Sequence, residues 1–126
     1  MNSAAENVPQ RLADHDIIWL ATTRPDGRPH LIAIWFVPVD GALWFATGAS
    51  SVKVTNLLAE PRVNVSLESG TDPLVGEGSA VVVPHPYPQP VVDAFRRRFD
   101  WDIASGDDDQ VGALALVRID IDRWRR

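Results

Sequence analysis

One short segment, residues 47–57, gathers the side chains best suited to binding an anion. Its lysine, Lys53, is the only lysine among the twelve basic residues of the chain. Ser50 and Ser51 stand just before an apolar pattern at helical spacing, so either serine can cap a helix that begins there. Lys53 then falls in the first helical turn, where the helix macrodipole disfavours a cation unless an anion is bound.

Free backbone amides, two hydroxyl groups and an ammonium group therefore converge at one helix start, which predicts a phosphate site. An ordinary surface lysine beside a serine cap is the alternative that this segment leaves open.

The other reactive side chains form no catalytic or metal-binding motif that we recognise. His15, His30 and His85 stand alone in the sequence, and we interpret them as surface or strand-end residues. The acidic run 107–109 falls in a predicted loop, and the arginine run 96–98 on a predicted solvated helix face. Nucleophile elbows, Walker loops and dinucleotide-binding fingerprints are absent from the sequence. We expect no metal site and assign no catalytic residue.

Composition narrows the class of protein further. The net charge of −5 argues against nucleic acid as the main partner, because phosphate neutralisation needs a basic face. The chain has no cysteine, so any redox chemistry requires a bound cofactor. The N-terminus lacks the pattern of a signal peptide, and no window approaches the roughly eighteen apolar residues of a membrane span. We expect one cytoplasmic domain covering residues 1–126, with no membrane partner.

Hydrophobic periodicity and turn residues divide the chain into strands and helices. The predicted strands cover residues 17–23, 30–37, 43–47, 62–68, 75–83 and 113–119. The predicted helices cover residues 50–60 and 89–101, and a helical turn or two is expected at 8–13. Asp26-Gly27 and Asp40-Gly41 mark two hairpins, which join the first three strands into a meander.

This order of elements predicts a mainly β fold. Neighbouring strands joined by hairpins leave long edges unless the sheet closes, so a small six-stranded antiparallel β-barrel with two or three short helices is expected. A β-sandwich is the alternative.

The ordered motifs of the chain resemble the pyridoxamine 5′-phosphate oxidase-like superfamily of flavin-binding split β-barrels. Its short FMN- or deazaflavin-dependent oxidoreductases are the branch that the sequence resembles most. The resemblance spans about residues 20–78. The motifs that carry it are Leu20-Ala21-Thr22-Thr23, Asp26-Gly27-Arg28-Pro29, Ile34-Trp35-Phe36-Val37, Trp44-Phe45-Ala46-Thr47-Gly48, Ser51-Val52-Lys53, Asn56-Leu57 and Pro61-Arg62-Val63.

The resemblance implies a Greek-key-like split barrel that forms a homodimer and binds its cofactor between two subunits. It implies that the cofactor is FMN, with the deazaflavin coenzyme F-420 as the alternative. The residues implied to bind the phosphate are Lys53 and Ser51, with Ser50 and Asn56 as weaker candidates. Those implied to line the ring and ribityl region are Thr47, Trp35 and Phe36, and Trp124 is implied to reach the partner's site.

The function that follows is a flavin-dependent oxidoreductase that transfers hydride to or from a small planar substrate. The chain is shorter than the vitamin-processing oxidase and lacks its pyridoxal-phosphate-binding residues, so oxidation of pyridoxamine phosphate is not expected. The alternative is a non-catalytic module on the same barrel that stores or senses a flavin or haem. A structural dimer without any ligand leaves the placement of Lys53 unexplained.

Overall fold

The computed structural model describes the backbone of residues 3–125 and the side chains from Val8 to Arg125. This part of the chain forms three helices and eight strands. In chain order they are α1 (Ser3–Ala13), β1 (Ile17–Thr23), β2 (Pro29–Trp35), β3 (Val37–Val39), β4 (Ala42–Gly48), α2 (Val52–Ala59), β5 (Arg62–Ser66), β6 (Val75–Val83), α3 (Gln89–Phe99), β7 (Asp107–Asp108) and β8 (Gly112–Arg125).

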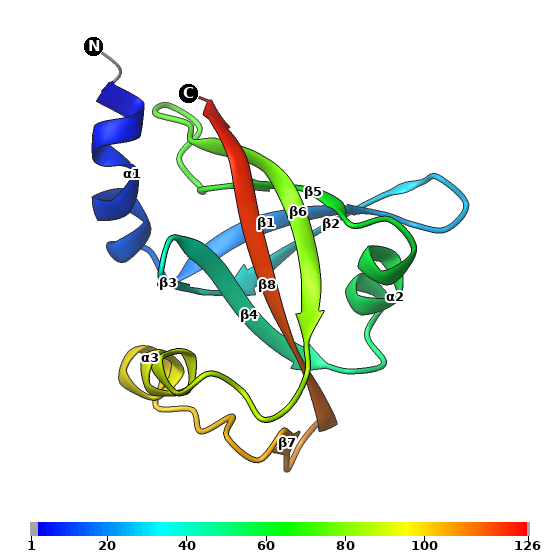
Figure 1. The fold of residues 1–126 in the computed structure, drawn as a ribbon. Coiled ribbons are helices and arrows are strands. Elements are labelled where there is room, and N and C mark those ends of the chain that lie inside the picture. The colour runs from blue at the N-terminus through cyan, green and yellow to red at the C-terminus, as the bar shows by residue number, and fades with distance from the viewer. Residues whose placement is uncertain (1–2, 126) are drawn as a thin grey trace.

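The strands form one antiparallel sheet in the order β2-β1-β5-β6-β8-β4-β3, and β7 pairs with β8 alone. The sheet curls into an open barrel, with α1, α2 and α3 around its outside (Figure 1). Within the described residues no ladder joins β2 to β4. The barrel is therefore split along the line between these two strands.

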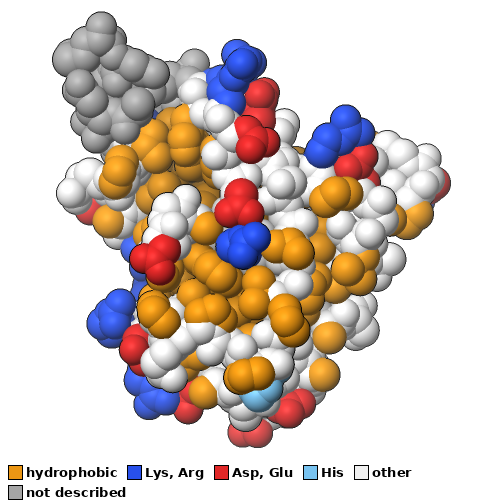
Figure 2. Space-filling view, viewed as in Figure 1, with side chains coloured by type: hydrophobic (Ala, Val, Ile, Leu, Met, Phe, Trp, Pro, Cys, Tyr) orange, Lys and Arg blue, Asp and Glu red, His pale blue; other side chains and the backbone are white. Residues whose placement is uncertain are grey.

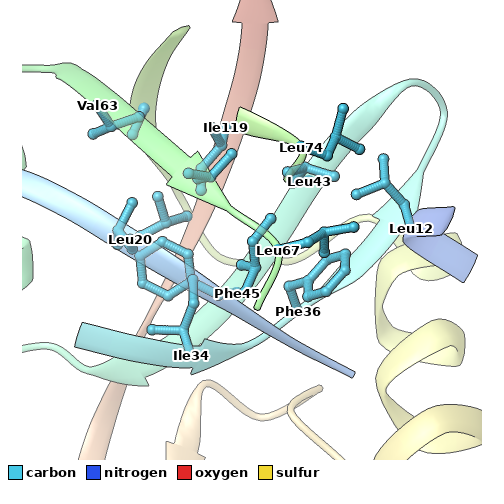
Figure 3. Packing of buried hydrophobic residues seen from close by; sticks show 14 of the residues in the cluster. Leu12, Leu20, Ile34, Phe36, Leu43, Phe45, Val63, Leu67, Leu74 and Ile119 are labelled. Atoms are coloured by element: carbon cyan, nitrogen blue, oxygen red, sulfur yellow. The ribbon is translucent and has the colours of Figure 1, made fainter. Parts of the chain in front are cut away.

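The interior of the barrel is the main hydrophobic core (Figure 3). Alternate residues of each strand point inward, as in β1, where Ile18 and Leu20 are fully buried. Phe36 and Phe45 meet in this core from β2–β3 and β4, and Leu57 closes it from α2. Such burial removes each side chain from water and stabilises it by about 1.5–3 kcal/mol.

A second core lies outside the barrel, where α3 covers part of β4 and β8. Val91, Val92 and Phe95 form the buried face of α3, and they pack against Trp44 and Leu116. Hydrophobic side chains also cover much of the face formed by β4, β6 and β8 around this helix, with charged side chains among them and at the margins (Figure 2).

The predicted mainly β split barrel is confirmed, but the strand count of six is not. The predicted strand 30–37 breaks at Phe36, because the chain leaves its pairing with β1 there and begins to pair with β4. The acidic run predicted as a loop contains the short strand β7, and the last strand continues past its predicted end at residue 119 to Arg125. The predicted helix 89–101 ends at Phe99, since Asp100 adopts a left-handed conformation with φ 51°.

None of the described helices is long and apolar enough to span a lipid bilayer.

Candidate functional site

A cavity of about 630 Å³ fills the split in the barrel. Its walls include residues 33–35 of β2 and residues 46–48 of β4. β4 pairs with β3 only through residues 42–44. Beyond residue 44, the same edge of β4 has no strand partner among the described residues, and it faces the cavity. The cavity thus lies between two strand edges that the fold leaves unpaired.

The backbone of β2 presents hydrogen-bonding groups at this edge. Just beyond the last pair of the β1–β2 ladder, Ile17 with Trp35, the N–H of Phe36 donates to the carbonyl oxygen of Asp16 at 3.1 Å, so Asp16 and Phe36 are a hydrogen-bonded pair in the same register. Such pairs alternate with non-hydrogen-bonded ones, so Ala33 and Trp35 direct their N–H and C=O groups away from β1. Both residues line the cavity, where a planar ligand would meet donors and acceptors along a strand edge.

The end of α3 and the turn after β7 form a second wall of the cavity. The Trp101 indole N–H donates to the Asp108 carboxylate at 3.1 Å, and this bond joins the two segments. The backbone N–H of Asp100 caps α3 by donating to the carbonyl oxygens of Arg96 and Phe95. Hydrogen bonds therefore fix the wall on both sides of Asp100.

An aromatic pair connects this wall to β2. The rings of Trp35 and Phe99 stack with centroids 4.7 Å apart and planes inclined by only 3°. Phe99 contacts Phe95, which is fully buried, with centroids 6.1 Å apart. Trp35 keeps 53% of its surface exposed, so the stack covers part of the indole and leaves the rest open.

Lys53 lines the same cavity from the first turn of α2. Burial lowers the pKa of its ammonium group, because removal from water penalises the charged form. None of the ion pairs among the described residues involves Lys53. A partly buried cation without an ion-pair partner among the described residues fits the binding of an anionic group.

Ser51 is the N-cap residue of α2, as the sequence predicts for Ser50 or Ser51. Its hydroxyl makes no capping hydrogen bond, and its Oγ atom is buried without a partner in the described residues. The helical ladder begins with the bond from Thr55 N–H to the Ser51 carbonyl oxygen, so the amides of residues 52–54 also lack helical acceptors. These unused groups at a helix start are suited to phosphate oxygens.

The predicted site residues separate into groups. Trp35, Thr47 and Lys53 line the cavity together. Ser50 and Asn56 line a second pocket, on the side of α2 that faces the β1–β2 hairpin.

Two predicted aromatic residues lie elsewhere. Phe36 is fully buried in the barrel core. Trp124 packs against that core beside Val8 and Leu12 of α1. It is not among the residues that line the cavity.

The basic residues are also dispersed. Arg24 and Arg28 line the second pocket with Ser50, whereas Arg62 pairs with Glu60 at 2.6 Å and Arg96 pairs with Asp102 at 2.7 Å. Arg98 is not on a solvated face: its guanidinium group donates to several backbone carbonyls.

Sequence reasoning missed the wall formed by Phe99, Asp100, Trp101 and residues 108–111. Only the spacing of Val91, Phe95 and Arg98 on one helical face could have indicated that this end of α3 packs inward. The stacking of Phe99 on Trp35 has no sequence signal, because 64 positions separate the two residues.

The structure is a split antiparallel barrel with a ligand-sized cavity between unpaired strand edges, beside a helix start that carries a lysine and unpartnered polar groups. The family model for pyridoxamine 5′-phosphate oxidase matches residues 4–126. The chain belongs to this family.

Solved structures similar to this chain span several activities. A conserved hypothetical protein of Mycobacterium tuberculosis, Rv2991, is 31% identical, with a TM-score of 0.77 over 99% of this chain and 83% of that chain. The heme storage protein HutZ of Vibrio cholerae is 19% identical, with a TM-score of 0.78 over 95% and 92%. An F420 reductase is 22% identical, with a TM-score of 0.71 over 92% and 94%. A search of curated proteins found no match.

Proposed function

We propose that the chain is a single-domain oxidoreductase that binds a flavin-type cofactor, FMN or the deazaflavin coenzyme F-420, in the cavity between β2 and β4. Two observations carry this proposal: Lys53 is partly buried in the cavity without an ion-pair partner among the described residues, and the Ser51 hydroxyl, two positions earlier, is buried without a hydrogen-bond partner there. Ser51 itself is not among the residues that line the cavity. Lys53, Ser51 and the first amides of α2 would hold the cofactor phosphate. Ser50 adjoins this site from the second pocket.

The unpaired strand edges support the placement of the ring. An isoalloxazine or deazaflavin ring is planar and carries hydrogen-bond donors and acceptors on its rim, which match the N–H and C=O groups of Ala33 and Trp35. Thr47 lies across the cavity from them on β4. When bound, the cofactor supplies hydride transfer, and the protein supplies orientation and a shielded site.

Two basic residues bear on the choice of cofactor. Coenzyme F-420 carries an anionic tail that FMN lacks, and Arg24 and Arg28 line the pocket on the other side of α2. Arg28 is engaged by Asp26 at 2.8 Å, and none of the hydrogen bonds and ion pairs of the described residues uses the Arg24 guanidinium group. If Arg24→Ala weakens F-420 binding and leaves FMN binding unchanged, the second pocket receives the tail.

Storage or sensing of haem on the same barrel is the second candidate, and the likeness to HutZ favours it. The cavity argues against it, because its lining contains no histidine, cysteine, methionine or tyrosine that could be an axial ligand of haem iron. The described residues of one subunit therefore supply a better site for a flavin than for haem.

We also propose that two copies associate through the outer face of the β1–β2 hairpin. Three cross-strand pairs, Ile17 with Trp35, Trp19 with Ala33 and Ala21 with Leu31, place apolar side chains on this face. Because Ala33 and Trp35 also line the cavity, a second copy on this face would cover the mouth of the cavity. The predicted reach of Trp124 into the partner's site requires such an assembly.

Association can be measured by analytical ultracentrifugation at micromolar concentration. Leu31→Lys places a charge in the proposed interface and should give monomers. Leu58→Lys is the matched control, because Leu58 is similarly exposed, 69% against 64%, but lies on α2. A monomeric wild-type protein would contradict the two-copy site.

Visible absorption titrations with FMN, coenzyme F-420 and haemin test the cofactor. We expect one of the first two to bind, with Lys53→Met and Ser51→Ala each weakening its affinity at least tenfold. Arg123→Met removes one positive charge from β8, outside the cavity, and should leave the affinity unchanged. Binding of haemin alone would favour the storage module. If a cofactor bound to the wild-type protein is not reduced by a nicotinamide or deazaflavin donor, the result would argue against an enzyme.

A further inference from the structure

We propose that Arg98 is a positioning residue of the cavity, because its guanidinium group holds two of the cavity walls at a fixed spacing. One of these walls is the edge of β2, and the other is the end of α3. This inference rests on the proposed function, since the spacing matters to a cofactor ring that both walls enclose. It assigns that spacing to a residue that does not line the cavity itself.

Arg98 contacts the chain directly beside each of the two walls. Phe99 and Asp100, which follow Arg98 in the chain, line the cavity at the end of α3. Residues 33–35 line it from β2, and the guanidinium group donates to the carbonyl oxygen of Phe36, the next residue, at 3.2 Å. The side chain therefore joins the backbone at one wall to the backbone at the other.

The remaining link between these walls leaves them free to slide. Among the described residues, no hydrogen bond except those of Arg98 joins α3 to β2 or to the break at Phe36. The stacked rings of Trp35 and Phe99 also connect the walls, with centroids 4.7 Å apart. Parallel rings accept a range of offsets, whereas a hydrogen bond fixes both a distance and a direction. Arg98 therefore supplies the alignment that the stack does not.

The end of α1 gives Arg98 a fixed anchor. The guanidinium group donates to the carbonyl oxygen of Ala13, the last residue of α1, at 2.8 Å, and to that of His15 in the turn after it. The last carbonyls of a helix lack helical donors, and the negative end of the helix dipole favours a cation beside them. Only 16% of the Arg98 side chain is exposed, so these bonds replace the water that the cation loses.

The substitution Arg98→Lys separates the charge of this side chain from its geometry. A guanidinium group carries five N–H donors in a rigid, planar fork, whereas an ammonium group is a compact donor on a flexible stem. The ammonium group can stay at the end of α1, but it cannot hold the Phe36 carbonyl oxygen in the same geometry. We therefore expect this variant to fold and to have loosened walls.

The first measurement follows the walls in the protein without a cofactor. Amide hydrogen exchange by NMR reports on the N–H of Phe36, which donates to Asp16, and on the N–H of Asp100, which caps α3. In Arg98→Lys, exchange at both amides should accelerate about tenfold more than at Val117, a fully buried residue of β8 that reports on global unfolding. Arg97→Lys, an exposed position on the same helix, is the matched control and should change none of these rates.

The second measurement separates the ring of the cofactor from its phosphate. Visible absorption titrations compare FMN with riboflavin, and coenzyme F-420 with its phosphate-free deazariboflavin. Arg98→Lys should weaken the cofactor and its phosphate-free form by the same factor, about fivefold, because the ring site is disturbed. Lys53→Met should weaken only the form that carries phosphate. Val65→Ala leaves a void in the barrel core outside the cavity lining, so it should lower stability and leave both affinities unchanged.

Either measurement can overturn the positioning role of Arg98. Exchange at Phe36 and Asp100 that changes no more than at Val117 contradicts it, whether or not a cofactor binds. Equal affinity of the wild type and Arg98→Lys for the cofactor and its phosphate-free form also contradicts it. If neither cofactor binds the wild-type protein, the proposed function fails, and the exchange rates alone decide whether Arg98 fixes the walls.

Discussion

The guanidinium group of Arg98 donates to the carbonyl oxygen of Phe36 at 3.2 Å and lies 5.4 Å from the centroid of the Phe36 ring. It also donates to the carbonyl oxygens of His15 and Ala13 at the end of α1. One side chain thus joins α3, the end of α1 and the break between β2 and β3. The neighbouring residues, Phe99 and Trp35, form the stack in the cavity wall.

Replacement of Arg98 should therefore destabilise the fold. Arg98→Met leaves several carbonyl oxygens without their donor, and hydrogen bonds to charged groups contribute about 1.5–3 kcal/mol each. We expect a loss of about 2–4 kcal/mol in the free energy of unfolding measured in urea. Arg97→Met is the matched control, because Arg97 is exposed, and it should change stability by less than about 0.5 kcal/mol. Equal effects of the two substitutions would contradict the anchoring role of Arg98.

Asn56 contributes to stability through a buried hydrogen bond. Its side-chain amide donates to the Thr22 hydroxyl at 3.0 Å, and only 1% of Asn56 is exposed. Asn56→Ala removes this bond and leaves the hydroxyl without its donor, so we expect a loss of about 1–3 kcal/mol by chemical denaturation. Thr55→Ala, one residue earlier on the exposed side of α2, should cost much less. An Asn56→Ala variant as stable as the wild type would show that water replaces the lost donor.

Lys53 should make the stability of the cofactor-free protein depend on pH. Burial lowers its pKa in the folded state below the ordinary value of about 10.4. Between the lowered pKa and the ordinary one, the unfolded chain binds more protons than the folded chain, so stability rises with pH in that window. Below the window the cost of burying the charge is fully present.

Thermal unfolding of the wild type and Lys53→Met from pH 7 to 10 isolates this contribution. The difference in unfolding temperature between the two proteins should be largest at neutral pH, where the variant is the more stable. This difference should shrink as pH rises. Affinity for a phosphate-bearing cofactor should fall over the same window, because the anion requires the protonated lysine. A pH-independent difference would show that Lys53 keeps its ordinary pKa.

Gly78 should tolerate no side chain. A Cβ atom at this position would lie 2.0 Å from the backbone oxygen of Asp120, at the irregularity in the β6–β8 ladder between Glu77 and Gly78. Gly78→Ala must push these central strands apart, so we expect a loss above about 3 kcal/mol or no folded protein. Gly70→Ala meets no atom within 4 Å and should be close to neutral in the same circular-dichroism melts. A folded Gly78→Ala variant with wild-type stability would contradict the close approach of the two strands.

The sequence by itself determined the local elements and where the groups proposed to bind phosphate lie along the chain. β-branched runs and Asp-Gly turns predicted the strands and hairpins, and the serines before an apolar helical pattern placed the start of α2 at Ser50 or Ser51, of which Ser51 is the N-cap residue. These signals are readable because each depends on neighbours within one turn or one hairpin. The place of Lys53 in the first helical turn follows from the same spacing, and Lys53 lines the cavity. Its binding of phosphate stays a prediction. The cytoplasmic location and the cofactor itself stay predictions.

Only the tertiary structure decided which side chains share a site. Phe36 and Asn56 carry the same sequence signals as cavity residues, but the closure of the barrel buries one in the core and the other against Thr22. Phe99 and the aspartates beside it reach the cavity because α3 folds back over β4 and β8. Contacts of this kind join distant segments through packing, and packing depends on the curvature of the whole sheet, which no local pattern encodes.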